Sequence, residues 1–410
     1  MSPRQLKTGF FILTAVNAFA TSYYFNYLFF YLQKQFGFGN LGNLTFSALN
    51  GFVYIFASLY GGRFAQSRGY FLALNLGFIG MVGVLLAGLF LPTVPGQLLV
   101  LLLWTVSVCF TWPTLEALVC EGEDLQGMPR MVGLYNIVWA SGAALAFFSG
   151  GAMAQVLGWK SLFWLPAILH LAQLGLALWL EKKHGPAKAP AGSPLPCEGR
   201  EIRGEGSAEG GRGFSRAGRA AEGGGTPAPL ARSFLRLAWV ANPLAYMAIN
   251  TALPLIPYVA QRLELSPMFA GFFCSAWMFA RLATFLLLRR WTGWHYRLGW
   301  LLWSYLLLIV SFAGLLLAPF LWAVVLAEIV FGWSIGLIYY SSLFYSMDAS
   351  ETKGVHGGVH EAAIGLGIFA GPALGAVAVG FLPHQVNASA WAVSGLLVVG
   401  MAVLAGLRKR

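Results

Sequence analysis

Charged residues are scarce in this chain. Only 10% of its 410 residues are Asp, Glu, Lys or Arg, whereas 58% are hydrophobic. A soluble globular domain has about 25% charged residues, so this composition excludes an ordinary soluble protein. The apolar residues instead form blocks of the length that crosses a bilayer as a helix. We count twelve such blocks, at about 8–34, 43–65, 71–92, 97–119, 130–156, 160–181, 234–261, 267–289, 298–317, 320–346, 354–382 and 388–407.

Motifs for catalysis and for metal or redox chemistry are absent from the sequence. There is no phosphate-binding Gly-Lys-Ser/Thr loop, no nucleophile elbow and no HExxH or CxxC spacing, which are the patterns of such sites. The four cysteines, Cys109, Cys120, Cys197 and Cys274, are too scattered for a metal site or a redox pair. We therefore expect no enzymatic activity, no cofactor and no metal ion.

The basic residues are unevenly distributed. The net charge is +11, and if the N-terminus is cytoplasmic, 22 of the 26 Lys and Arg fall in cytoplasmic segments. This is the positive-inside pattern of a membrane protein and not the basic patch of a nucleic-acid-binding protein. It predicts an even number of spans with both termini in the cytoplasm. The "AFA" at 18–20 resembles a signal-peptide cleavage site, but the apolar run continues past it.

Residues 182–232 interrupt the apolar pattern. This stretch is rich in Gly, Ala, Arg and Glu, so it cannot bury enough apolar surface to offset the entropy cost of ordering. We expect a disordered cytoplasmic linker between an N-terminal six-helix bundle, 1–181, and a C-terminal one, 233–410. The halves also resemble each other, as parallel transporter repeats do. An offset of 225 residues aligns the fifth block with the eleventh and pairs Gly133 with Gly358, Gly142 with Gly367 and Gly150 with Gly375.

A short basic turn, "GGRFAQSRGY" at 61–70, follows the second block. Together with twelve spans in two halves, it resembles the G-x-x-x-D-x-x-G-R-[RK] loop of the major facilitator superfamily. Gly62, Arg63 and Gly69 fit that pattern, whereas Gln66 replaces the acid and the terminal basic pair is missing. The resemblance implies an all-α membrane fold of two pseudo-symmetric bundles that acts as a monomer.

The resemblance also implies a cytoplasmic gating role for this turn, with Gly62, Arg63, Gln66, Arg68 and Gly69 as its residues. We expect Arg63 and Arg68 to pair with acids after the fourth block. The alternative is that both arginines only follow the positive-inside pattern. The candidate acids are Glu121, Glu123 and Asp124.

Polar side chains recur on single faces of the first and seventh blocks, at spacings of three, four and seven. In the resembling family, helices 1, 4, 7 and 10 line the solute cavity, which predicts a cavity face for these residues. Hydrogen bonding between helices is the alternative, at about 0.6 kcal/mol each. The predicted solute-binding residues of these blocks and of the tenth are Asn17, Thr21, Tyr24, Tyr246, Asn250, Tyr339 and Tyr340.

Charges inside the blocks are few, and such residues are functional candidates by default. Arg281 lies about eight residues from the cytoplasmic end of the eighth block, roughly 12 Å deep. It is predicted to clamp an anionic group of the solute, with a structural ion pair to Glu328 as the alternative. Burial favours the neutral form of a carboxyl group, so Glu328 and Glu361 are the proton-coupling candidates. His360 is equally consistent with a relay and with helix packing.

These features predict a secondary transporter of the cell membrane that moves a small polar or anionic organic solute by alternating access, coupled to protons. The first alternative is a proton-driven efflux antiporter for amphipathic compounds, which an aromatic cavity would suit. The Gly-Pro pair of the antiporter signature, however, lies in the eleventh block and not the fifth. A membrane enzyme or sensor built on His356, His360 and Glu361 is the alternative of another class.

Overall fold

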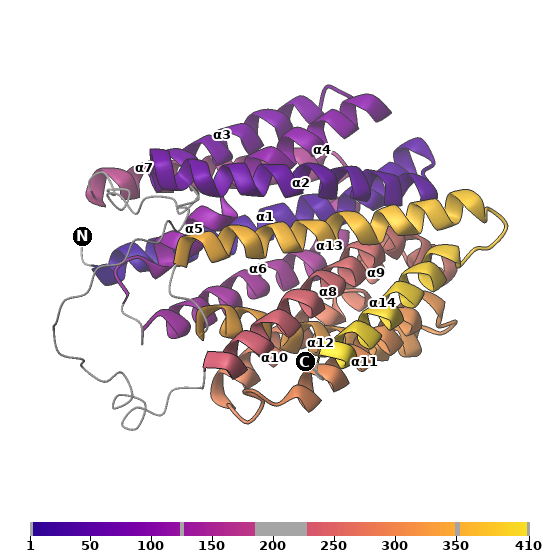
Figure 1. The fold of residues 1–410 in the computed structure, drawn as a ribbon. Helices are drawn as coiled ribbons and strands as arrows, with labels where there is room; N and C mark the ends of the chain where they lie inside the picture. The colour runs from indigo at the N-terminus through magenta and orange to yellow at the C-terminus, as the bar shows by residue number, and fades with distance from the viewer. Residues whose placement is uncertain (1–2, 124–126, 185–227, 349–352, 408–410) are drawn as a thin grey trace, which may run out of the picture.

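The computed structural model describes residues 3–123, 127–184, 228–348 and 353–407. Every regular element in these ranges is an α-helix (Figure 1). The helices of the first half are α1 Pro3–Phe36, α2 Asn40–Arg68, α3 Tyr70–Gly88, α4 Val94–Cys109, α5 Trp112–Cys120, α6 Gly127–Leu157 and α7 Ser161–His184. Those of the second half are α8 Ala228–Arg262, α9 Pro267–Phe273, α10 Ala276–Arg290, α11 Leu298–Leu317, α12 Leu321–Asp348, α13 Lys353–Phe381 and α14 Ala388–Leu407.

Eleven helical segments are long and apolar enough to cross a membrane. The pairs α4–α5 and α9–α10 each count as one of the eleven, and α1 is not among them. Helix α1 has 34 residues, but its polar stripe of Thr and Asn and its tyrosines lower its hydropathy. The ends of the expected linker are helical, because α7 reaches His184 and α8 begins at Ala228. Residues 185–227 lie outside the described part of the chain.

Two of the spans are interrupted, and the two breaks differ in cause. Between α4 and α5, Phe110 and Thr111 bond to carbonyls three residues back, and Pro113 follows in the first turn of α5. Proline lacks an amide hydrogen and cannot continue an α-helix from the preceding turn. The break between α9 and α10 falls at Cys274 and Ser275, where the sequence has neither proline nor glycine.

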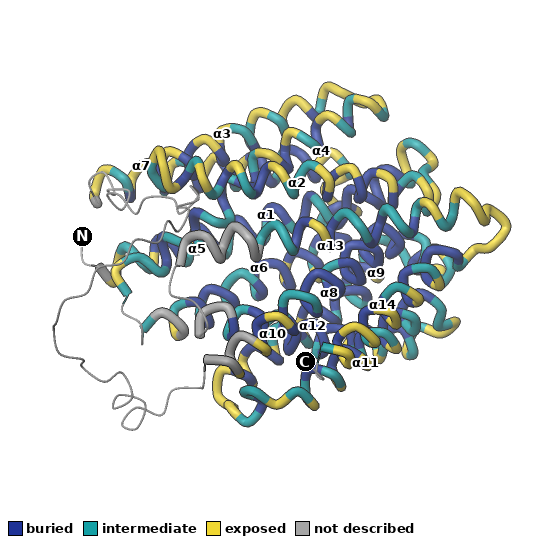
Figure 2. Tube along the Cα trace, in the orientation of Figure 1, coloured by how far each residue is buried: buried dark blue, intermediate teal, exposed yellow. Residues whose placement is uncertain are grey.

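The helices pack lengthwise into a single bundle (Figure 1). Helices α1 to α7 contact one another, as do α8 and α10 to α14, and the main contacts between the groups join α2 to α13 and α6 to α9 and α10. Helix α8 is the most deeply buried of the eleven spans. Exposed positions concentrate on outward-facing surfaces (Figure 2), and many are large and apolar, such as Trp322 at 69% exposure. An apolar outer surface is what a bilayer requires.

One end of the bundle is closed by direct contacts between the two groups. We call it the distal end; it carries the α1–α2, α6–α7 and α8–α9 connections and lies on the right in Figure 1. The Gln33 side-chain amide donates to Gln261 Oε1 at 3.1 Å, and Asn43 Nδ2 donates to the Pro254 carbonyl at 3.1 Å. Gly151 of α6 lies directly against the backbone of Pro267 at the start of α9. These contacts form the distal seal.

The distal seal predicts a steric effect at Gly151. A Cβ atom there would overlap the Pro267 carbonyl, so Gly151→Leu should force α6 and α9 apart. We expect the free energy of unfolding to fall by about 1–3 kcal/mol, measured as a lower Tm of the detergent-solubilised protein. The matched control is Gly175→Leu in α7, because no atom lies within 4 Å of a Cβ at Gly175. Equal Tm values for the two variants would contradict the tight contact.

Candidate solute-binding site

Arg281 of α10 lies between the two groups of helices and is enclosed by aromatic rings. Its side chain is buried, with 3% exposure. The guanidinium carbon lies 4.7 Å from the ring centroid of Trp139 on α6, 4.8 Å from that of Tyr339 on α12 and 5.5 Å from that of Phe285 on α10. Cations are attracted to the faces of such rings. The arginine is therefore held by residues from both groups.

The guanidinium has no carboxylate partner among the described residues. The one ion pair in that part of the chain joins Lys7 and Glu123, so the alternative of an Arg281–Glu328 ion pair is wrong. Nε and Nη2 of Arg281 make no hydrogen bond, and the nearby Tyr246 side chain interacts with the arginine. An isolated buried charge is costly. Arg281 thus presents unpaired donors that an anion would satisfy.

Two of the predicted tyrosines, Tyr246 and Tyr339, lie in this region, and a third, Tyr340, does not contact the arginine. Tyr246 of α8 and Tyr339 of α12 have ring centroids 6.2 Å apart, and both remain partly exposed although they lie within the bundle. Tyr340 points elsewhere, because its ring packs 5.9 Å from both Phe285 and Trp294. The structure therefore brings Tyr246 and Tyr339 together with Arg281, and places Tyr340 behind Phe285.

Two carboxyl groups lie on the other side of the same region. Glu361 of α13 accepts a hydrogen bond of 2.8 Å from the Tyr54 hydroxyl of α2. Glu116 of α5 is near enough to Glu361 to interact with it electrostatically, and Glu361 interacts in the same way with Tyr246 and Tyr339. Glu116 and Glu361 are both partly exposed. The site thus combines one guanidinium, two carboxyl groups and several rings.

The predicted residues of α1 make their described contacts inside the first group of helices. Asn17 Nδ2 donates to Thr111 Oγ1 at 3.2 Å, and Thr21 Oγ1 donates to the Asn17 carbonyl at 2.7 Å. Tyr24 is fully buried, with its ring 4.9 Å from that of Trp104. Asn17 alone matches the alternative of hydrogen bonding between helices, since the Thr21 bond lies within α1 and Tyr24 packs through its ring. A solute-binding role for the three stays a prediction.

Asn250 of α8 also serves the packing of helices. Its side-chain amide donates to the Tyr246 carbonyl at 3.0 Å, and its own carbonyl accepts from Ser47 Oγ of α2 at 3.3 Å. The residue therefore links α8 to α2 near the site without a described contact to Arg281. Its role toward a solute stays a prediction.

The other proton-coupling candidates lie outside this cluster of described contacts. Glu328 of α12 is fully buried, and its carboxyl group lies beside Cys274 and the backbone of Ala276 and Trp277 at the α9–α10 break. His360 belongs to α13, but its side chain lies outside the described residues. Both remain predictions.

The predicted gating turn is mostly helical. Gly62, Arg63, Gln66 and Arg68 belong to the last turns of α2, and Gly69 alone links α2 to α3 with a φ of +109°, a region that favours glycine. The arginines are exposed. The expected pairing with Glu123 is wrong, because Lys7 of α1 takes that carboxylate; Asp124 lies outside the described residues.

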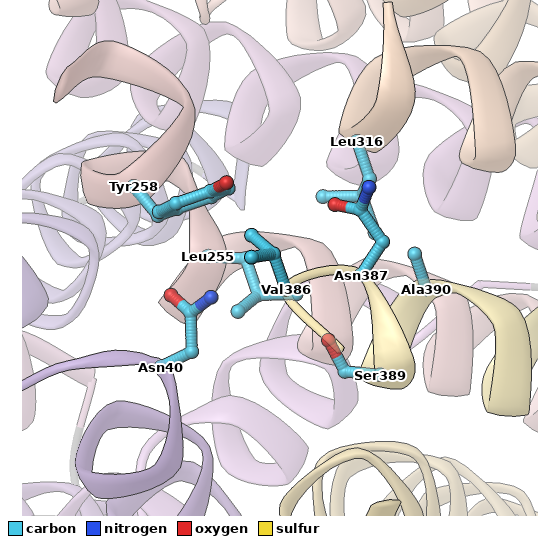
Figure 3. Close-up of a pocket in the computed structure, with 8 residues that line it drawn as sticks. All are labelled: Asn40, Leu255, Tyr258, Leu316, Val386, Asn387, Ser389 and Ala390. Carbon is cyan, nitrogen blue, oxygen red and sulfur yellow. The ribbon is translucent and has the colours of Figure 1, made fainter. Parts of the chain in front are cut away.

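A cavity at the distal end is too small for a solute (Figure 3). Its volume of about 10 Å³ corresponds to about one water molecule. Side chains from α2, α8, α11, the α13–α14 connection and α14 line it: Asn40, Leu255, Tyr258, Leu316, Val386, Asn387, Ser389 and Ala390. The Arg281 region is therefore the better candidate site.

Sequence reasoning missed three contributors to the site, namely Trp139, Tyr54 and Phe285. Each is an aromatic residue in an aromatic-rich chain, which is 15% Phe, Trp and Tyr, so no local pattern distinguishes them. A search for rings on helices flanking a buried charge would have included them. Glu116 carried a clearer signal, as a carboxylate within an apolar block.

Comparisons with known proteins agree with this architecture. The model of the Major Facilitator Superfamily matches residues 126–372, more than half of the chain, whereas no curated protein matches the sequence. The human organic anion transporter MFSD10 (TETRAN) has 16% identity and a TM-score of 0.64 over 98% of this chain and 100% of its own. The nucleoside transporter NupG has 14% identity and a TM-score of 0.67 over 98% and 99%.

A third structure is a bacterial homologue of the human lysosomal transporter Spinster, with 11% identity and a TM-score of 0.64 over 99% of this chain and 96% of its own. At such identities these likenesses show the fold alone. The match to the family model goes further, since it covers α6 and α7 of the first group, α8 to α12 and most of α13 of the second, and with them the Arg281 region. The chain belongs to the major facilitator superfamily, a family of multi-pass membrane transporters.

Proposed function

We propose that this protein is a secondary active transporter that moves a small anionic organic solute by alternating access and couples the movement to protons. The observation that carries the proposal is Arg281, a buried guanidinium at the interface of the two groups with no counter-ion among the described residues. One of the similar structures is that of an organic anion transporter, which supports the same solute class.

The proposed topology has twelve spans, with α1 as the twelfth, and both termini in the cytoplasm of a plasma-membrane monomer. Helix α1 packs among α5, α6, α7 and α8, the place of a core helix. Residues 1–181 and 233–410 then form the two rocking bundles, joined by the segment between them. The distribution of Lys and Arg supports this orientation, which puts the distal seal on the outer side.

The proposed anion site uses the geometry around Arg281. A planar guanidinium binds carboxylate or phosphate through paired hydrogen bonds, and Nε and Nη2 of Arg281 are both unpaired donors. The rings of Trp139 and Tyr339 flank the cation and offer apolar surface to the rest of the solute. Because Trp139 and Arg281 come from different groups, a bound anion contacts both halves at once.

Proton coupling is proposed for Glu361, which is partly exposed within the site. Loss of its proton changes the charge opposite Arg281, and Tyr54 supplies a hydrogen bond to the carboxylate from the other bundle. Glu116, which interacts with Glu361, belongs to the same acidic pair. Glu328 and His360 are further candidates from the sequence.

The second candidate function is proton-driven efflux of amphipathic compounds. The ring enclosure of Trp139, Tyr246, Phe285 and Tyr339 favours it. A guanidinium at the centre of the site, however, repels cationic drugs. It therefore favours an anionic solute whether the protein acts as an importer or as an exporter.

Arg281→Ala should abolish accumulation of the solute. In proteoliposomes with an imposed proton gradient, we would scan labelled organic acids, nucleosides, sugars and amino acids for uptake by the parent protein. Loss of the charge-assisted hydrogen bonds should reduce uptake at least 10-fold, since such bonds contribute about 1.5–3 kcal/mol each. Arg289→Ala is the matched control, because Arg289 is exposed on the same helix. Undiminished uptake of an anion by Arg281→Ala would remove the proposed clamp.

Glu361→Gln separates coupling from binding. The amide cannot carry the transported proton, so gradient-driven accumulation should be lost while exchange of labelled for unlabelled solute continues. Tyr54→Phe, which removes the hydrogen-bond donor to Glu361, should retain accumulation with an altered pH profile. Unchanged proton-driven accumulation in Glu361→Gln would exclude the residue as the coupling group.

A further inference from the structure

The α9–α10 break is formed by two residues, Cys274 and Ser275, neither of which is proline or glycine. The amide of Cys274 bonds to the Ala270 carbonyl at 2.8 Å and closes α9, and the amide of Met278 bonds to the Ser275 carbonyl at 3.0 Å and opens α10. Ser275 Oγ donates to the Phe272 carbonyl at 3.1 Å, and such side-chain bonds bend helices only slightly. Sharp distortions also arise where a group from elsewhere inserts into the hydrogen-bond ladder, and a side chain from α12 lies against this turn.

Glu328 of α12 is that side chain. Its carboxyl lies beside the backbone amides of Ala276 and Trp277, the first two residues of α10, and beside the Cys274 thiol. Its side chain has 0% exposure, and neither oxygen has a hydrogen bond of standard geometry to the described residues. The first amides of a helix lack partners within it and carry partial positive charge. The carboxylate is thus placed where a helix N-terminus attracts an anion.

Glycines hold α12 close enough to α10 for this contact. Gly332, one turn after Glu328, lies directly against the Trp277 backbone, and Gly336, one turn further, lies against Thr284. A side chain at either position would push α12 away. The position of the Glu328 carboxyl relative to α10 is therefore fixed by helix packing and not by its own rotamer alone.

The break joins two functional parts of the bundle. Helix α9 forms the distal seal, through Pro267 against Gly151 and through Gly271 against the Phe148 carbonyl and the Tyr27 hydroxyl. Helix α10 carries Arg281, five residues after its first residue. A change of the angle at the break would alter the seal and the solute site together.

Space for a proton carrier lies beside the break. A cavity of about 10 Å³, lined in part by Asn26, Tyr27 and Cys274, has room for about one water molecule. Cys274 is the titratable side chain that faces Glu328 from the neighbouring span. No ion pair of Glu328 is formed among the described residues.

We propose that Glu328 is an interhelical cap that holds the α9–α10 break open, and that proton binding to Glu328 releases this cap and loosens the distal seal. In this step the Glu328 carboxylate takes up one proton and becomes a neutral carboxyl group. Its attraction to the α10 amides then falls. The inference deepens the proposed proton coupling, but it concerns helix geometry and is testable without any solute.

The test measures the distance across the distal seal. Spin labels are placed on cysteines introduced at Val156 of α6 and Phe269 of α9, which are both exposed. The full chain is used, with Cys109, Cys120 and Cys197 replaced by serine and the buried Cys274 retained. Double electron–electron resonance in nanodiscs at pH 8 and pH 5 then reports the separation. We expect a single short distance at pH 8 and a shift toward longer distances at pH 5.

Variants decide whether Glu328 causes the shift. Glu328→Gln should show the longer distances at both pH values, whereas the control Glu264→Gln, at an exposed glutamate of the α8–α9 connection, should keep the response of the parent. A parent distance that does not change with pH overturns the proposal even if Glu328→Gln fails to fold. So does a pH response that survives in Glu328→Gln. Failure of the proposed solute transport would appear in the uptake assays and leave these distances unaffected.

Discussion

A positive charge that has no negative partner among the described residues, buried inside a bundle of apolar helices, is the constraint on which the site depends. Burial removes the Arg281 guanidinium from water, so the surrounding helices must compensate for its lost hydration. They do so with ring faces from Trp139, Tyr339 and Phe285. Each favourable ring contact stabilises a cation by about 0.5–2 kcal/mol and leaves its charge unneutralised. An incoming anion can supply the part of the stabilisation of the buried charge that the rings do not provide.

The same helices explain why this arrangement lies at the interface. A cation whose partners all belonged to one group of helices would form no contact across the interface. Arg281 and its ring partner Trp139 instead belong to opposite groups. The Glu361 carboxyl group is shared between the groups in the same way, because it accepts a hydrogen bond from Tyr54 of the other group. Charge and hydrogen-bonding capacity are thus shared between the two groups of helices. The groups also meet through close backbone contacts at Gly51 and Gly151 and through ring contacts such as that of Phe147 with Trp277.

Much of the helical content was predictable from the sequence, because apolar runs long enough to cross a bilayer indicate membrane-spanning helices. The orientation of each side chain about its helix was not. The stripe of Asn17, Thr21 and Tyr24 has the spacing of one helix face, but hydrophobic periodicity cannot tell a protein-facing polar stripe from a cavity-facing one. Arg281 stood out because charge is rare in an apolar block. Its ring partners did not, since no pairwise pattern links Trp139 to a residue 142 positions later.

The break in the α9–α10 span shows a different limit of sequence reading. Local rules detect proline, and Pro113 explains the α4–α5 break in this way. The part that we propose for Glu328 in the α9–α10 break carries no local mark, because Glu328 lies more than 50 residues downstream. Only the packing of α12 on α10, through Gly332 and Gly336, places Glu328 beside the break.

The backbone contact at Gly51 has a mechanical consequence. There α2 lies directly against Ile368 and Phe369 of α13, with no side chain between the two helices, so this point resists separation and permits rotation. Eleven residues of α2 extend from it to Asn40 and seventeen to Arg68, which are lever arms of roughly 16 Å and 25 Å at 1.5 Å per residue. A given angle of rocking therefore displaces the Arg68 end about one and a half times as far as the Asn40 end. The unequal arms turn a small opening at the distal end into a larger closure at the other.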